Sequence, residues 1–138
     1  MEPLTMVLIE DSPIIIGLVT AFLEHTQTGL TTLAGAARSG PEGLELVERT
    51  RPSAVVVDLR LPGMSGLDVV RQLRAKDERV AIVVLSSADR DAFETPAVEA
   101  GADAYVGKDQ VTSALVPALR RAVRARATPA GPGDPRDV

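Results

Sequence analysis

The 138-residue chain contains no cysteine and no tryptophan, and only one tyrosine and two phenylalanines. Without cysteine it can form neither a disulfide framework nor a thiolate metal site, which fits a reducing compartment. No apolar run approaches the roughly 20 residues of a membrane span, and the N-terminus lacks the basic and apolar regions of a secretory signal. We therefore expect a cytoplasmic protein that does not associate with membranes.

The chain also lacks an excess of positive charge. Its formal net charge of −4 argues against direct nucleic-acid binding. The arginines that gather late in the chain more often form a solvated face that matches the dipole of a terminal helix. These residues are Arg120, Arg121, Arg124 and Arg126. A content of 45% hydrophobic and 25% charged residues is ordinary for one globular domain of this length.

Short apolar runs alternate with helical patterns along the chain. This alternation predicts repeated βα units, and hence a parallel sheet covered by helices on both faces. The predicted fold is a flavodoxin-like (βα)5 doubly wound α/β domain with strand order 2-1-3-4-5. The strands are predicted at residues 5–9, 30–37, 55–58, 80–85 and 104–106, and four of the helices at about 13–26, 41–50, 65–76 and 113–127.

Prolines and glycines mark the uncertain parts of this pattern. Pro96 lies where the fourth helix needs a backbone N–H, so we expect that helix to be kinked, short or to begin near Pro96. Residues 128–138 are rich in proline and glycine and have no apolar pattern. We therefore expect a folded domain over residues 1–127 and a disordered tail over residues 128–138.

The first helix has more apolar surface than a core-facing helix requires. Its apolar side chains cover an arc of roughly 200°, whereas a stripe of about 100° usually suffices. Two interpretations remain open. The helix is either sunk between two neighbouring elements, or it offers a docking face to a partner. That face would include Ile14, Ile15 and Phe22.

Acidic residues follow two of the predicted strands directly. Glu10 and Asp11 end the first strand and Asp58 ends the third, and the predicted strand order makes these two strands neighbours. Clustered carboxylates raise one another's pKa, and a divalent cation relieves that conflict. All-oxygen ligation favours a hard ion such as Mg²⁺, or Mn²⁺. The alternative, in which each acid only caps a loop, does not explain why all three share one edge of the sheet.

Two further polar residues are predicted at the same edge. Ser86 ends the fourth strand and Lys108 follows the fifth. A hydroxyl, an ammonium and a metal ion facing Asp58 would neutralise the oxygens of a phosphoryl group in transfer, and such a reaction needs little beyond positioning and charge. The sequence therefore predicts that Asp58 is phosphorylated on its carboxylate.

The segment Asp58–Gly66, with the sequence DLRLPGMSG, closely resembles the phosphorylation site of response-regulator receiver domains. The resemblance extends over residues 5–127, because the acidic residues, the serine, the tyrosine and the lysine follow one another in the order that the family has. It implies roles for each of them: Asp58 as phosphoacceptor, Glu10 and Asp11 as the metal pair, the backbone carbonyl of Arg60 as a further metal ligand, Lys108 and Ser86 as phosphoryl contacts, and Ser86 with Tyr105 as the switch.

The resemblance also implies a function. Such a protein takes a phosphoryl group from a sensor histidine kinase or a phosphotransfer protein, and is no enzyme beyond catalysing its own phosphorylation and dephosphorylation. Tyr105 can point outward before phosphorylation and turns inward afterwards, when the phosphoryl group draws Ser86 toward it. The surface of the fourth helix, fifth strand and fifth helix then changes, either for an unknown downstream protein or for a phosphorylation-dependent homodimer.

One departure from the common receiver pattern refines the resemblance. Lys108 is followed by Asp109, where many receivers have a proline. This variant resembles receivers joined to helix-turn-helix output domains, although we expect a stand-alone regulator here. A rival function is a small haloacid-dehalogenase-like aspartyl-phosphate phosphatase, but Arg60 occupies the place of that family's second aspartate. A binding module that keeps only the fold is a third alternative.

Overall fold

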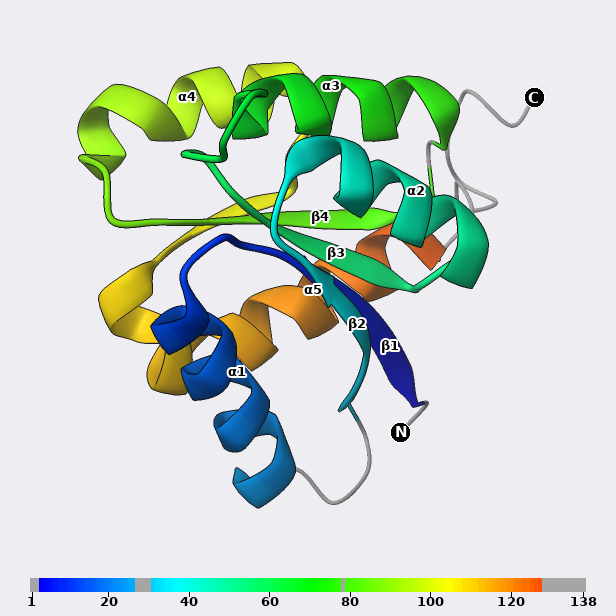
Figure 1. Cartoon of the computed structure of the whole chain (residues 1–138), viewed down its shortest axis with the longest axis vertical. Helices are drawn as coiled ribbons and strands as arrows, with labels where there is room; N and C mark the ends of the chain where they lie inside the picture. Colours follow the sequence, from blue (N-terminus) through cyan, green and yellow to red (C-terminus); the bar gives the residue numbers. More distant parts are fainter. Residues whose placement is uncertain (1–2, 27–30, 78, 128–138) are drawn as a thin grey trace, which may run out of the picture.

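The computed structural model describes residues 3–26, 31–77 and 79–127. Within them, a five-stranded parallel sheet lies between two layers of helices (Figure 1). Its order, β2-β1-β3-β4-β5, is the predicted doubly wound order. The strands are β1 (Leu4–Ile9), β2 (Thr31–Ala37), β3 (Ala54–Asp58), β4 (Ala81–Ser86) and β5 (Ala104–Gly107). The predicted tail, residues 128–138, and the predicted strand start at Leu30 lie outside the described residues.

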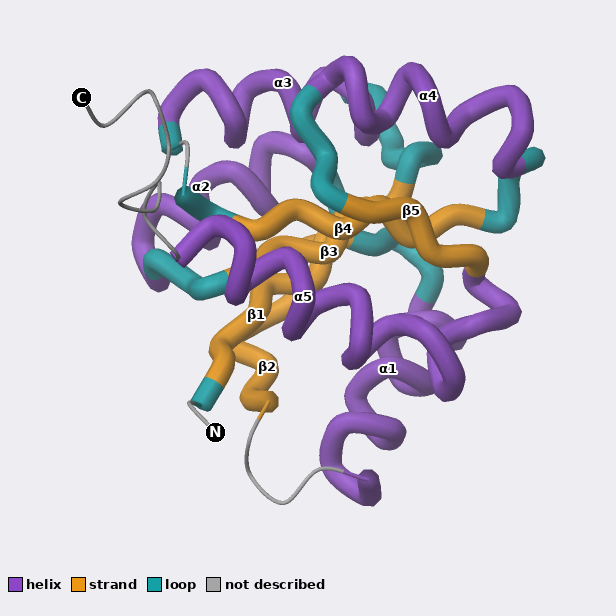
Figure 2. Tube along the Cα trace, turned by 180° about the vertical axis from the view of Figure 1, so that it is seen from behind, coloured by secondary structure: helices purple, strands orange, loops and turns teal. Residues whose placement is uncertain are grey.

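The helices divide between the two faces of the sheet (Figures 1 and 2). They are α1 (Pro13–Thr26), α2 (Gly40–Thr50), α3 (Gly66–Lys76), α4 (Arg90–Ala100) and α5 (Val116–Ala127). One apolar core lies between the sheet and helices α1 and α5, and a second lies beneath α2, α3 and α4. Every residue of β3 and β4 is buried, which explains why these strands read as continuous apolar runs. No helix in the described part of the chain is long and apolar enough to cross a membrane.

Side-chain caps fix the starts of three helices at the predicted residues. The hydroxyl of Ser12 accepts a hydrogen bond from the backbone N–H of Ile15 at 3.4 Å. Ser39 and Ser65 cap α2 and α3 in the same way, three residues before the donor N–H. Each cap follows the C-terminal end of a strand or its loop, so the helix N-termini are directed toward one edge of the sheet.

Two of the alternatives predicted for the fourth helix, a short helix and a start near Pro96, were wrong. Helix α4 begins at Arg90, well before Pro96, and is as long as α2 and α3. Its cap is Asp89, whose side chain accepts a hydrogen bond from the N–H of Asp91 at 3.0 Å. The helix also buries Ala97 completely. A satisfied N-terminus and a buried turn beyond the proline outweigh the one backbone hydrogen bond that Pro96 removes.

The chain before α5 is less regular than the predicted helix from about Ser113. A 3₁₀ turn (Lys108–Gln110) and a π-helical turn (Val111–Leu115) precede α5, which begins only at Val116. Pro117 follows directly, and its ring would clash with the carbonyl of Ser113 in a regular α-helix. A widened turn before the proline accommodates that ring.

Asp103 connects three elements at the edge of the sheet opposite the acidic residues. Its Oδ2 accepts hydrogen bonds from Arg74 Nη2 at 3.1 Å and from the backbone N–H of Ile82 at 2.9 Å. Its Oδ1 accepts one from Arg126 Nε at 2.8 Å. Arg74 also donates to the carbonyls of Gly101 and Val80. This junction ties the C-terminal ends of α3 and α5 to the start of β4.

Candidate functional site

Three carboxylates converge at the C-terminal ends of β1 and β3. Ile9 and Val57 are register partners in these neighbouring strands, so the residues that follow them lie side by side. Ligand oxygens of Glu10, Asp11 and Asp58 all lie within 4.8 Å of one another. Glu10 has no exposed surface and Asp58 is 3% exposed, whereas Asp11 is open to solvent. The cluster predicted from the sequence is therefore present, with two acids buried and one at the rim.

Lys108 is the cation of this pocket. Its Nζ lies 3.1 Å from Asp58 Oδ2 and forms a hydrogen bond with it. The same atom lies 2.9 Å from Glu10 Oε1, an ion pair whose geometry falls outside that of a hydrogen bond. One ammonium therefore faces two buried carboxylates, and Oε1 of Glu10 remains a buried oxygen without a hydrogen-bond donor in the described residues.

Backbone groups hold the other carboxylate oxygens. The N–H of Ser12 donates to Glu10 Oε2 at 3.1 Å, and the N–H of Arg60 donates to Asp58 Oδ1 at 3.2 Å. Gly66 packs against the backbone of Asp58 so closely that a Cβ there would overlap the Asp58 carbonyl oxygen. Both oxygens of Asp58 thus have fixed partners, and the first turn of α3 supports the strand end that carries it.

Burial and charge act on the pocket in opposite directions. Burial raises the pKa of Glu10; contact with Lys108 and the Ser12 N–H opposes this shift, and neighbouring Asp58 adds to it. Burial alone would lower the pKa of Lys108, but its contacts with Glu10 and Asp58 outweigh burial, so that the pKa is raised. The pocket therefore keeps its ammonium charged and has more negative charge than one ammonium neutralises.

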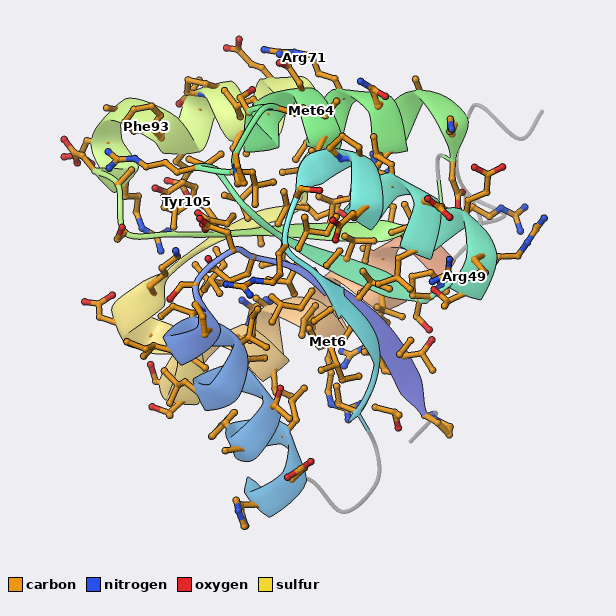
Figure 3. All side chains as sticks on the ribbon, viewed as in Figure 1. Met6, Arg49, Met64, Arg71, Phe93 and Tyr105 are labelled. Atoms are coloured by element: carbon orange, nitrogen blue, oxygen red, sulfur yellow. The ribbon has the colours of Figure 1, made fainter. Side chains whose placement is uncertain are left out.

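Ser86 and Tyr105 lie beside this pocket, on β4 and β5. Ser86 is 2% exposed, and its hydroxyl accepts a hydrogen bond from the N–H of Ala88 at 2.9 Å. Tyr105 is 5% exposed and donates its O–H to the carbonyl of Ala88 at 3.0 Å. The ring lies between the sheet and the N-terminal half of α4 (Figure 3). The ring is therefore inward and hydrogen-bonded here, although the resemblance allows it to point outward before phosphorylation.

The apolar arc of α1 is divided between the core and solvent. Val19 and Leu23 are buried, and Ile15 and Phe22 pack partly against the same core. Ile14 is 81% exposed. Leu18, one turn later, is 41% exposed. Of the three residues predicted for docking, only Ile14 is therefore fully available to a partner.

Sequence reasoning missed several contacts around the site. Arg38, at the end of β2, donates to the backbone carbonyl of Asp11 at 3.1 Å. Arg90 covers the Tyr105 ring and is itself bonded to Gln110, which belongs to a different element. No local motif signals these side chains, because each depends on how distant segments pack. The close approach at Gly66 did have a signal, a glycine that directly follows the capping residue of a helix.

Comparison with known proteins identifies a family model and several relatives that match most of the chain. The family model described as "Response regulator receiver domain" matches residues 6–120. The nitrate/nitrite response regulator protein NarL of Escherichia coli K12 is 35% identical over 121 residues, which cover 88% of this chain and 55% of NarL. The chain spans about half the length of the curated relatives it matches. These matches give no support to a haloacid-dehalogenase-like phosphatase.

Solved structures agree with the family match. The chain is similar to a LuxR-family two-component response regulator from Aurantimonas sp. SI85-9A1, with a TM-score of 0.82 at 29% identity over 91% of this chain and 88% of that one. It is also similar to the BeF3-activated receiver domain of Klebsiella pneumoniae RstA, with a TM-score of 0.77 at 30% identity over 87% and 98% of the two chains. With the acidic pocket and the doubly wound sheet already described, these matches show that the chain belongs to the response regulator receiver domain family.

Proposed function

We propose that the chain accepts a phosphoryl group on Asp58 from a sensor histidine kinase or a phosphotransfer protein, and then signals to a downstream protein. One observation carries this proposal. Asp58 ends β3, Glu10 directly follows β1 and Lys108 directly follows β5, and the three side chains meet in one pocket with contacts of 2.9 and 3.1 Å. A buried cluster of this kind is costly for folding alone, which supports a functional role for it.

The donor atoms of the pocket suit a hard divalent cation such as Mg²⁺ or Mn²⁺. Three carboxylates offer oxygen ligands, and among the described residues the buried Oε1 of Glu10 faces only the ammonium of Lys108, at 2.9 Å. Asp11 and Asp58 would hold the ion directly, the carbonyl of Arg60 would add a ligand, and Glu10 would support them from behind. When bound, the ion neutralises charge on the phosphoryl oxygens.

The remaining residues of the site have separate tasks. A carboxylate oxygen of Asp58 attacks phosphorus, while the bond from phosphorus to the donor's nitrogen or oxygen breaks and its electron pair leaves with the donor. The Lys108 ammonium neutralises a phosphoryl oxygen as charge develops there. The Ser86 hydroxyl, which accepts a hydrogen bond from the Ala88 N–H, would donate its own proton to a phosphoryl oxygen. These steps modify the chain itself, so the protein needs no separate substrate site.

The output of this reaction would be a change at the surface of α4, β5 and α5. Tyr105 and Ser86 share Ala88 as a hydrogen-bond partner, through its carbonyl and its N–H respectively. A movement of the Ser86 hydroxyl toward a phosphoryl group would therefore disturb the residue that also holds the Tyr105 ring. This shared partner supports a coupled switch, which would act on a downstream protein or promote a homodimer.

Phosphorylation of Asp58 can be tested with small phosphodonors. The purified chain is incubated with Mg²⁺ and acetyl phosphate or phosphoramidate, and its mass is measured. We expect one added phosphoryl group in the wild type and in Asp68→Asn, which removes an exposed acid outside the pocket. Asp58→Asn should abolish the addition. Labelling that survives Asp58→Asn would refute the assignment, and steady turnover of a phosphomonoester would indicate a phosphatase instead.

A further inference from the structure

Arg90, the first residue of α4, is fixed above the ring of Tyr105. Its Cζ lies 5.2 Å from the ring centroid, within the range of a cation–π contact. Its Nη1 donates to Glu94 Oε2 at 3.1 Å, and its Nη2 donates to Gln110 Oε1 at 3.2 Å. A planar guanidinium with both ends bonded has a defined position. Arg90 therefore covers Tyr105 as an ordered group, although it lies at the surface.

Gln110 connects Arg90 to the chain next to the phosphorylation pocket. Its Oε1 accepts a second hydrogen bond from the backbone N–H of Gly107 at 3.1 Å. Gln110 also belongs to the short 3₁₀ turn that begins with Lys108. The contact between Arg90 and Gln110 thus ties the start of α4 to the segment that carries the pocket lysine.

These residues line an open pocket next to Lys108. It has a volume of about 380 Å³, and its lining includes Arg90, Tyr105 and Gln110 together with Ser86 and Lys108. Besides its packing in the core beneath α4, the Tyr105 side chain contacts the guanidinium of Arg90 and the carbonyl of Ala88. Neither of these two contacts involves Asp58.

We propose that Arg90 and Gln110 form a latch that holds Tyr105 inward before Asp58 is phosphorylated. The effect on signalling rests on the proposed function, in which the inward ring belongs to the phosphorylated state. A contact that favours one of two states raises the affinity of every ligand that binds that state. Arg90 is therefore a positioning residue. It acts through Tyr105 and sets the fraction of the chain that is ready to bind a phosphoryl group.

The sequence provides a specific probe of the ring. Tyr105 is the only tyrosine of the chain, and there is no tryptophan. Chain labelled with 3-fluorotyrosine will therefore give its ¹⁹F signal from Tyr105 alone. Broadening of that signal by a soluble paramagnetic reagent measures how far the ring is exposed. We expect little broadening in the wild type and a severalfold increase in Arg90→Gln, measured without any phosphoryl mimic.

Arg71→Gln is the matched control for this substitution. Arg71 lies on the outer side of α3 (Figure 3) and forms an ion pair with Asp68 at 2.7 Å with half of its side chain exposed. It has a helical ion pair like that of Arg90 but lies away from Tyr105, so we expect wild-type broadening in this variant. Gln110→Ala, which removes the other half of the latch, should reproduce the effect of Arg90→Gln. A ring that stays protected in both latch variants would refute the latch.

The coupling to phosphorylation is measured with beryllofluoride and Mg²⁺. Titration of the same ¹⁹F signal should show an affinity about fivefold weaker in Arg90→Gln than in the wild type, as expected for losing one or two weak contacts that favour the inward state. A ring released without any loss of affinity would refute the coupling. If the wild type itself does not bind beryllofluoride, the proposed function is refuted. The latch is still tested in that case, because the exposure of the ring is measured without beryllofluoride.

Discussion

The ammonium of Lys108 lies 2.9 Å from Oε1 of Glu10, a carboxylate with no exposed surface. The same ammonium is the hydrogen-bond donor to Asp58 Oδ2. One positive charge therefore compensates two buried negative charges. This unequal balance leaves excess negative charge, which would favour a bound cation, and it also makes the pocket a weak point in the stability of the fold.

Lys108→Met should strongly destabilise the chain in the presence of a metal chelator. Removing one partner of a buried ion pair leaves unpaired charge and typically costs about 3–5 kcal/mol. Urea unfolding followed by circular dichroism measures this loss. The control is Lys76→Met, because Lys76 pairs with Glu48 at 3.8 Å on an exposed surface and should change stability by less than about 0.5 kcal/mol. Equal losses in both variants would contradict the charge balance described for the pocket.

The loss in Lys108→Met should shrink as the pH falls. The pKa of Glu10 is raised by burial in the folded chain, so the folded state binds this proton more tightly than the unfolded state. For such a group, stability is greatest below the unfolded pKa and is lost as the pH rises through the folded pKa. Without the ammonium the Glu10 pKa should rise further. Unfolding of the variant and the wild type between pH 7 and about 5 should therefore converge, and a difference that widens would contradict this.

Mg²⁺ should stabilise the wild type against heat. An ion that binds only the folded chain adds about 1.4 kcal/mol at ten times its dissociation constant. Asp11→Asn and Asp58→Asn should reduce or abolish this shift, since both residues would ligate the ion. Glu45→Gln removes an acid that is 76% exposed on α2 and should keep the full shift. Thermal unfolding with and without chelator checks the prediction, which a shift retained in Asp58→Asn would contradict.

Gly66→Ala should destabilise the chain and slow phosphorylation. The new methyl group would overlap the carbonyl oxygen of Asp58, and overpacking against a fixed backbone typically costs about 1–3 kcal/mol. Gly17→Ala is the matched control, because nothing lies within 4 Å of a Cβ at that exposed position in α1. It should stabilise the chain by about 0.5–1 kcal/mol through helix propensity. Unfolding measurements that rank the two variants in the opposite order would refute the close approach at Gly66.

Ile14→Asp should weaken phosphoryl transfer from the cognate kinase while labelling by acetyl phosphate stays unchanged. Ile14 is 81% exposed on α1, so the substitution disturbs a docking face and not the core. Val98→Asp is the control, since Val98 is 52% exposed on α4, away from this face. Phe22→Asp is less informative because Phe22 packs partly against the core. Equal effects of Ile14→Asp on both phosphodonors would exclude a docking role.

The sequence predicted the sheet and the acidic cluster because both depend on local patterns. A buried strand followed by Asp58, or by Glu10, places its acid at the C-terminal edge, and the right-handed βα connections then bring those edges together. The serine caps of the first three helices are equally local. The start of α4 was mispredicted because Pro96 was given more weight than Asp89, whose cap and buried helix turn decide the outcome.

The remaining features depend on contacts between distant segments. The inward ring of Tyr105 is held by Arg90 and by the carbonyl of Ala88, and nothing in the spacing of these residues encodes the ring's direction. The contact between Arg38 and the Asp11 carbonyl is of the same kind. The contacts of such side chains can be predicted only once the packing of the elements is known, because many residues in the sequence could pair with a surface arginine.

Asp103 has a mechanical consequence. It binds the C-terminal end of α5 through Arg126 and that of α3 through Arg74, and so anchors both helices at the edge of the sheet remote from Asp58. Any displacement that begins beside Lys108 would then rotate α5 about its anchored end. The helix would move most near the pocket and least at the anchor.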